Sequence, residues 1–185
     1  YAYEVIKNFS VSATFKYLFS DMGRIGNSRG ASSVAFDLGV LYKCEINDWE
    51  GAGWSVGLHV SNLGPKINYL TSKDALPATV KVGGAADLPF LQMHKLTLTA
   101  DLGYRLSPAD VQALSVSAGA EYAWRELVML RGGYHCGDKK KGDASYATAG
   151  AGVEYAGVRL DFAWLFAGHE YLARNTFWVS LGYSF

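Results

Sequence analysis

The sequence predicts an all-β fold, a transmembrane antiparallel up-and-down β-barrel, from three observations. The composition combines 21 Gly and 12 Tyr with nine Phe, five Trp and only four Pro, which favours many short strands over helices. Segments of about ten residues alternate between an apolar and a polar face. The connections between these segments are alternately short and long, as in bacterial outer-membrane barrels.

Length and charge exclude several classes of protein. The 185 residues form one domain, residues 1–185, in which 17 Lys plus Arg balance 17 Asp plus Glu. A neutral chain gives no reason to expect nucleic-acid binding. No stretch approaches the roughly 20 apolar residues of a membrane helix. No signal peptide opens the sequence, and we expect the leader that export requires to have been removed or to lie upstream.

About ten strands are predicted from the period-two pattern. They span residues 9–20, 33–44, 52–62, 78–87, 95–105, 114–124, 128–136, 146–155, 158–166 and 176–185. In the segment 158–166, Val158, Leu160 and Phe162 share one face while Arg159 and Asp161 share the other. The last segment has one wholly apolar face and runs to the C-terminal residue: Phe177, Val179, Leu181, Tyr183 and Phe185.

Charged residues keep to a single face of every strand. They are Lys16, Asp37, Lys43, His59, Lys81, Asp87, Asp101, Arg105, Glu121, Arg131, His135, Glu154, Arg159 and Asp161. A soluble β-sandwich also alternates, with its apolar face turned inward. The membrane interpretation is favoured because the charged face is also rich in small residues, as a crowded lumen tolerates. Aromatic residues near the strand ends suit the two lipid headgroup levels.

Loop lengths favour the barrel and predict its orientation. The long connections are residues 21–32, 63–77, 106–113, 137–145 and 168–171, and the short ones are 45–51, 88–93, 125–127 and 156–157. Bacterial barrels have short periplasmic turns and long outer loops. We therefore expect a bacterial outer-membrane location with the C-terminus on the periplasmic side.

Several segments resemble PorV-type proteins of the type IX secretion system of Bacteroidetes. The most particular are Asn62-Leu63-Gly64-Pro65-Lys66-Ile67-Asn68-Tyr69 and Leu76-Pro77-Ala78-Thr79-Val80-Lys81-Val82-Gly83; Leu130-Arg131-Gly132-Gly133-Tyr134 fits the same pattern. The resemblance implies a fourteen-stranded barrel similar to the FadL fatty-acid transporters. It also implies that this chain is the C-terminal part, with about four strands preceding it, unless the chain forms a smaller closed barrel of even strand number.

The resemblance implies protein traffic rather than chemistry. Proteins of this type act as a carrier and plug. They bind the C-terminal signal domain of secreted cargo at the translocon and pass it to a sortase-like surface attachment complex. The expected partners are therefore the type IX translocon protein, cargo signal domains, the attachment complex, membrane lipid and lipopolysaccharide. A FadL-like transporter of hydrophobic solutes or a diffusion porin is the alternative.

Two sets of residues are candidates for these roles. The longest loop offers an apolar surface to a partner, unless its side chains fold back to cap the barrel mouth: Leu63, Pro65, Ile67, Tyr69, Leu70 and Leu76. A lumen charge network is expected from Asp101, Arg105, Glu121, Arg131, Glu154, Arg159 and Asp161. The run Lys139, Lys140 and Lys141 is favoured as a solvated loop tip over a contact with lipopolysaccharide or an acidic partner.

No catalytic or metal site is predicted. His135, Asp138, Asp143, His169 and Glu170 lie near the outer rim, but no spacing among them requires a shared site. Four His and two Cys form no metal-ligand pattern and no cofactor is expected.

The two cysteines are expected to stay unbonded to each other. Cys44 and Cys136 end strands of opposite direction, which places them at opposite rims of an apolar band roughly 25 Å tall. A disulfide needs Cα atoms within about 7 Å.

Overall fold

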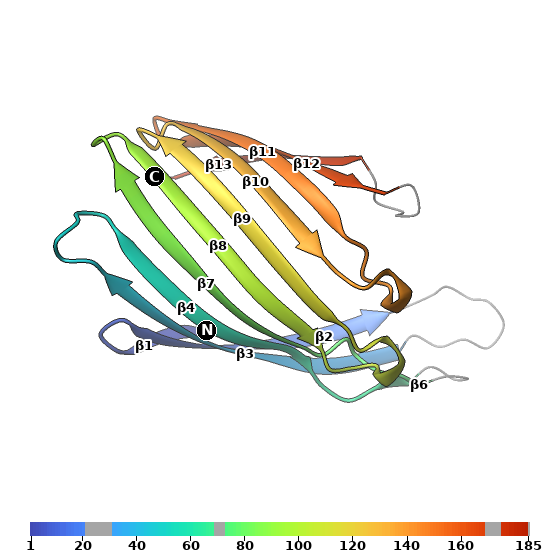
Figure 1. Cartoon of the computed structure of the whole chain (residues 1–185). Helices are drawn as coiled ribbons and strands as arrows, with labels where there is room; N and C mark the ends of the chain where they lie inside the picture. The colour runs from blue at the N-terminus through green and yellow to red at the C-terminus, as the bar shows by residue number, and fades with distance from the viewer. Residues whose placement is uncertain (21–30, 69–72, 169–174, 185) are drawn as a thin grey trace.

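The chain folds into one curved antiparallel sheet (Figure 1). The computed structural model describes residues 1–20, 31–68, 73–168 and 175–184. The sheet contains β1 (Ala2–Ile6), β2 (Phe9–Ser20), β3 (Ala31–Glu45), β4 (Gly53–Leu63), β7 (Thr79–Phe90), β8 (His94–Arg105), β9 (Leu114–Trp124), β10 (Val128–Cys136), β11 (Tyr146–Tyr155), β12 (Val158–Ala167) and β13 (Thr176–Tyr183). A separate hairpin joins β5 (Ile67–Asn68) to β6 (Lys73–Asp74), and two 3₁₀ turns are η1 (Ala109–Val111) and η2 (Lys139–Lys141).

The sheet is an up-and-down meander of 11 strands in which each strand pairs with its neighbours along the chain. This confirms the predicted fold class. The sheet is open: among the described residues, β1 and β13 each have one partner strand. No helix in the described ranges is long and apolar enough to cross a membrane.

The predicted strands are found close to their expected bounds, with two differences. An eleventh strand, β1, precedes them and returns through a turn in which Asn8 has a φ of 72°. β7 continues past Asp87 to Phe90 although it includes Pro89, which pairs with Lys95. A proline donates no ladder hydrogen bond, yet the pairing of β7 with β8 continues through Phe90. Phe185, at the end of the last predicted strand, lies outside the described residues.

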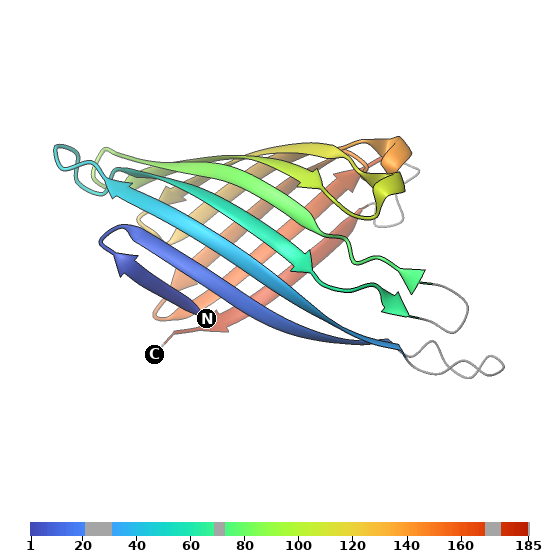
Figure 2. The same ribbon diagram turned by 90° about the horizontal axis from the view of Figure 1, so that it is seen from below.

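The two ends of the sheet differ in their connections. Residues 7–8, 46–52, 91–93, 125–127 and 156–157 make short turns at one end, here named the turn end. Residues 64–78, 106–113 and 137–145 join strands at the other, here named the loop end (Figures 1 and 2). The predicted alternation of short and long connections is confirmed for these connections, whereas most of the predicted long connections 21–32 and 168–171 lies outside the described residues. Figure 2 shows the β5–β6 hairpin projecting beyond the rim at the loop end.

Strand register gives the sheet one charged and one apolar face. Lys16 pairs opposite Ala35, His59 opposite Lys81, and Glu121 opposite Arg131. The apolar side chains on the other face are open to the surroundings: Leu130 is 54% exposed and Leu160 is 50% exposed. None of the described large side chains is fully buried. An apolar outer surface without a hydrophobic core is typical of a barrel wall that faces lipid.

Candidate functional site

Four residues at the loop end, here named the clamp, join the two ends of the longest described loop. They are Lys16, Asp37, Asn62 and Pro77. Lys16 Nζ on β2 lies 2.5 Å from Asp37 Oδ2 on β3. The other carboxylate oxygen of Asp37 accepts a hydrogen bond from the Asn62 backbone N–H at 2.8 Å. Asn62 Oδ1 accepts from Lys16 Nζ at 3.2 Å, and its Nδ2 donates to the Pro77 carbonyl at 3.1 Å. Asn62 thus joins both ends of the loop to the inner face.

A β-bulge places Asn62 in this position. The β3–β4 register shifts between Phe36 and Leu38, which pair with Leu63 and Val60. The extra residue leaves Asn62 with a φ of 58°, a conformation that asparagine tolerates better than most residues. Its N–H cannot bond within the regular ladder there, and the Asp37 carboxylate satisfies it instead.

The clamp folds the loop inward over β3. Ser33 Oγ donates to the Pro65 carbonyl at 3.0 Å, and Ala35 beneath the loop is 0% exposed. Leu76 is buried at 7% exposure, whereas Leu63 and Pro65 are exposed and Ile67 is half-buried. Tyr69 and Leu70 lie outside the described residues. Of the candidate loop residues, Leu76 therefore caps the inner face while the other three described ones remain near the surface.

A second long connection, residues 137–145, is also held against the inner face. His135 on β10 has its Nε2 3.0 Å from Asp143 Oδ1 and its ring stacked on Tyr146 at 4.8 Å. Arg105 Nη1 on β8 donates to the Lys141 carbonyl at 3.1 Å. Two loops separated in sequence thus fold over the same end of the sheet.

Ser117, His135 and Asp143 are in contact in the order of a Ser–His–Asp hydrolase triad, but the site lacks an oxyanion hole. Ser117 Oγ lies 3.0 Å from His135 Nδ1, on the opposite side of the ring from Asp143. Ser117 is paired with His135 and Asp101 in the strand ladder, so the backbone around it offers no pair of free N–H groups to an oxyanion. Sequence reasoning missed the pairing of His135 with Asp143. Asp138 instead caps η2, and His169 and Glu170 lie outside the described residues.

Five of the seven predicted network residues form one ladder across β9 to β12. Arg131 Nε pairs with Glu121 Oε2, and its Nη1 lies 2.5 Å from Asp161 Oδ1. Arg159 Nε lies 2.8 Å from Asp161 Oδ2, and its Nη1 is 3.8 Å from Glu154 Oε2. Acids and bases alternate through the ladder, so each charge has an opposite charge beside it.

The other two predicted network residues lie apart from this ladder. Arg105 binds the Lys141 carbonyl in the second long loop. Asp101 lines a groove of about 530 Å³ on the inner face, together with His59, Lys81 and small residues such as Gly39 and Gly83. Asp101 makes no ion pair with any other described residue.

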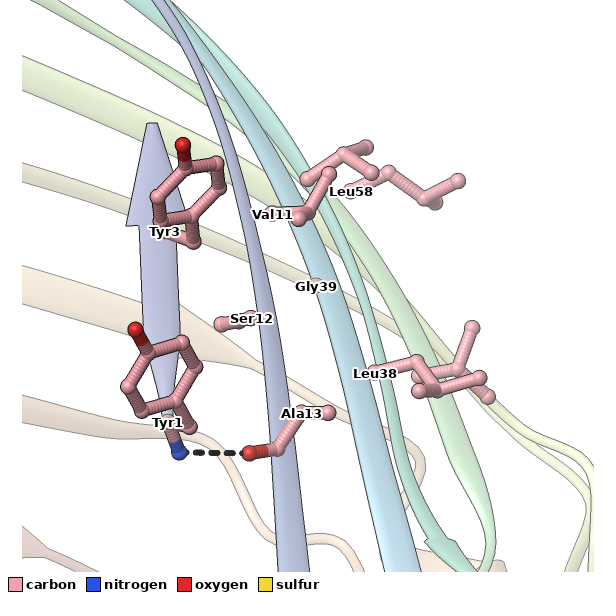
Figure 3. A pocket seen from close by; sticks show the side chains of 10 residues that line it. Tyr1, Tyr3, Val11, Ser12, Ala13, Leu38, Gly39 and Leu58 are labelled. Carbon is pink, nitrogen blue, oxygen red and sulfur yellow. Dashed lines mark hydrogen bonds between the residues drawn. The ribbon is translucent and has the colours of Figure 1, made fainter. Parts of the chain in front are cut away.

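Two further hollows lie away from the loop end. A groove of about 400 Å³ on the apolar face is lined by Tyr1, by Tyr3 of β1, and by Leu38 and Leu58 of β3 and β4 (Figure 3). A polar pocket of about 680 Å³ at the turn end is lined by Lys43, Glu45, Asp87 and Lys95 among others. Cys44 lies at the turn end of β3 and Cys136 at the loop end of β10, and both are free thiols. The described residues contain no cluster of three potential metal ligands.

A comparison with models of known protein families shows which family the chain belongs to. The family described as type IX secretion system protein PorV matches residues 1–112. The chain belongs to the PorV family. This confirms the resemblance noted in the sequence, and it makes the protein an outer-membrane component of the type IX secretion system. A search of curated proteins found no significant match.

The part of the chain that matches the PorV family contains the clamp but not the charge ladder. Lys16, Asp37 and Asn62 all lie within residues 1–112, as does the loop that they hold. The Arg131 ladder and the His135–Asp143 contact lie beyond them. PorV is a secretion-system component and not a known enzyme family.

Proposed function

We propose that this PorV-family protein is the carrier and plug of its secretion system. It binds the C-terminal signal domain of secreted cargo at the translocon and delivers it to the surface attachment complex. The observation that carries the proposal is the arrangement of the loop end. Two long loops are fastened to side chains of the inner face, and the β5–β6 hairpin lies at the rim beside β3.

The inward loops favour a plug over an open pore. The clamp fastens residues 64–78 to β2 and β3, and residues 137–145 are fastened to β8 and β10. Cross-strand charge pairs fill part of the inner face farther from the rim. A diffusion pore needs this path clear of backbone and paired side chains.

The β5–β6 hairpin and the residues that lead into it from β4 supply the contact surface in this proposal. Leu63 and Pro65 are exposed and Ile67 is half-exposed, beside the exposed charges Lys66 and Lys73. A small apolar centre with a polar border is the usual composition of a protein–protein contact. Side chains on a hairpin held by a clamp lose little conformational freedom on binding.

Binding of a purified cargo signal domain to the full chain tests this proposal. Ile67→Asp is expected to weaken binding at least about tenfold, because it places a charge in an apolar contact. Val111→Asp, in the neighbouring connection at the same end, is the matched control and should bind normally. Equal loss in both variants, or no loss in either, would contradict the assignment of the hairpin.

The FadL-like transporter or porin remains the second candidate, favoured by the small-residue groove on the inner face. Conductance in planar bilayers separates the two functions. The carrier should give no steady channels and should copurify with cargo. Large steady channels without bound cargo would support the pore.

A further inference from the structure

The groove on the apolar face of β1 to β4, here named the wall groove, has a volume of about 400 Å³ (Figure 3). Val11 and Ala13 of β2 form its floor with short side chains. Tyr3 of β1 pairs directly with Val11, and the Tyr1 carbonyl accepts a hydrogen bond from the Ala13 N–H at 2.8 Å. Directly paired residues share a face of the sheet, so both tyrosines stand along one side of this floor. Leu58 of β4 lines the other side.

Aromatic residues stand on the same face beyond both ends of the floor. Alternate residues of a strand share a face, so Phe9 and Phe15 flank the two floor residues along β2. Toward the turn end, Phe9 pairs with Tyr42 of β3. Toward the loop end, Phe15 pairs with Phe36 of β3, and their ring centroids lie 5.3 Å apart. Larger side chains therefore border the wall groove at both ends and along both sides.

The wall groove lies in the half of the wall nearer the turn end. β2 starts at the turn end with Phe9, and Val11 is the third of its 12 residues. Beside the same end, Tyr42 contacts Trp54, with ring centroids 5.6 Å apart. Aromatic residues near strand ends mark the headgroup level of a membrane. A lipid whose headgroup lies at this level extends its chains toward the membrane centre along the wall groove.

We propose that the wall groove binds one acyl chain of a phospholipid from the periplasmic leaflet. No charged side chain lines the groove, and its contacts fit a hydrocarbon chain. The bordering rings favour a narrow, flexible occupant, because the broad wall of another membrane protein cannot reach the floor between them. The site rests on the predicted orientation of the turn end toward the periplasm and not on cargo binding.

A lipid titration of the delipidated full chain in detergent micelles, followed by native mass spectrometry, tests the site. The probe is phosphatidylethanolamine, and we expect one molecule to bind to each chain more tightly than any further ones. Ala13→Phe places a ring on the floor of the wall groove. This variant should bind the first lipid molecule at least about tenfold more weakly, because the ring occupies the space of the acyl chain.

Ala118→Phe is the matched control, because Ala118 is exposed on the apolar face of β9, opposite Tyr134 and outside the wall groove. This control should bind the lipid like the unchanged protein. Val11→Phe, with Val116→Phe of β9 as its control, repeats the comparison at the second floor residue. Circular dichroism identifies folded variants, and the second pair keeps the test decisive if Ala13→Phe does not fold.

Three results would overturn the proposal. The unchanged protein could show no first lipid molecule that binds more tightly than the rest. The groove variants and their controls could lose affinity equally, which would mean that the lipid binds elsewhere on the apolar face. Purified lipopolysaccharide could bind at the wall groove more tightly than phosphatidylethanolamine, which would exclude a phospholipid of the periplasmic leaflet as the occupant.

Discussion

Single polar residues decide the arrangement of the inner face. Asn62 makes three hydrogen bonds at the bulge. Its backbone N–H donates to the Asp37 carboxylate, its Oδ1 accepts from Lys16, and its Nδ2 donates to the Pro77 carbonyl at the far end of the loop. Arg131 connects acids from two different strands, Glu121 and Asp161. A charge that is partly removed from water needs such partners. Leaving it unpaired destabilises the fold by more than an ion pair contributes to stability.

The central position of Arg131 predicts an unequal effect of two arginine substitutions. Arg131→Met leaves Glu121 without its ion-pair partner and is expected to lower the free energy of unfolding by about 1–2 kcal/mol. Arg159→Met should cost less, because Arg159 is more exposed and Asp161 keeps Arg131. Urea unfolding of the refolded barrel measures both. A larger loss for Arg159→Met would contradict the order of the ladder.

Tight turns join the strands at the turn end without the usual turn residues. Arg125 and Glu126 have φ values of 53° and 56°, and Ala156 and Gly157 have 51° and 79°. Two successive positive φ values are typical of a type I′ turn, whose twist matches that of the paired strands. Only Gly157 adopts this conformation without a steric cost, so the hairpins impose it on the other three residues.

Gly157 is expected to tolerate no side chain. A Cβ at this position would lie 2.5 Å from the Ser184 carbonyl oxygen. Gly157→Ala should therefore lower the free energy of unfolding by about 1–2 kcal/mol. Gly132→Ala is the control, because a Cβ there meets no atom within 4 Å. The prediction is wrong if the two variants unfold at the same urea concentration.

At the scale of the whole molecule, one curved sheet separates two environments. The apolar face is exposed over all the long strands, and the charged face holds the ion pairs and the inward loops. An apolar band of this kind is stable only against lipid. Short turns at one end and long loops at the other make the two ends of the molecule unlike, and this difference predicts how it sits in the membrane.

The loop end is expected to face the outside of the cell and the turn end the periplasm. Lys139→Cys and Asp48→Cys place exposed thiols at the two ends, in a background with Cys44→Ser and Cys136→Ser. A membrane-impermeant maleimide should label the Cys at position 139 on intact cells. The Cys at position 48 should react only after the outer membrane is broken. The opposite pattern would reverse the orientation.

The sequence by itself determined the fold class, the strand order and the two faces. These follow from local rules: alternation has a period of two residues, and each short turn pairs a strand with the next one along the chain. The same rules placed the charges on one face before any contact was known. They missed β1, because a five-residue strand carries too little alternation to stand out.

Only the tertiary structure decided which charges meet. Lys16, Asp37 and Asn62 lie far apart in the sequence, and a bulge with no clear sequence signal brings them together. The paths of the long loops likewise bury Leu76, join His135 to Asp143, and draw Arg105 away from the predicted network. Register and loop path depend on the sum of many distant contacts, whereas the alternation of a strand depends on its own residues.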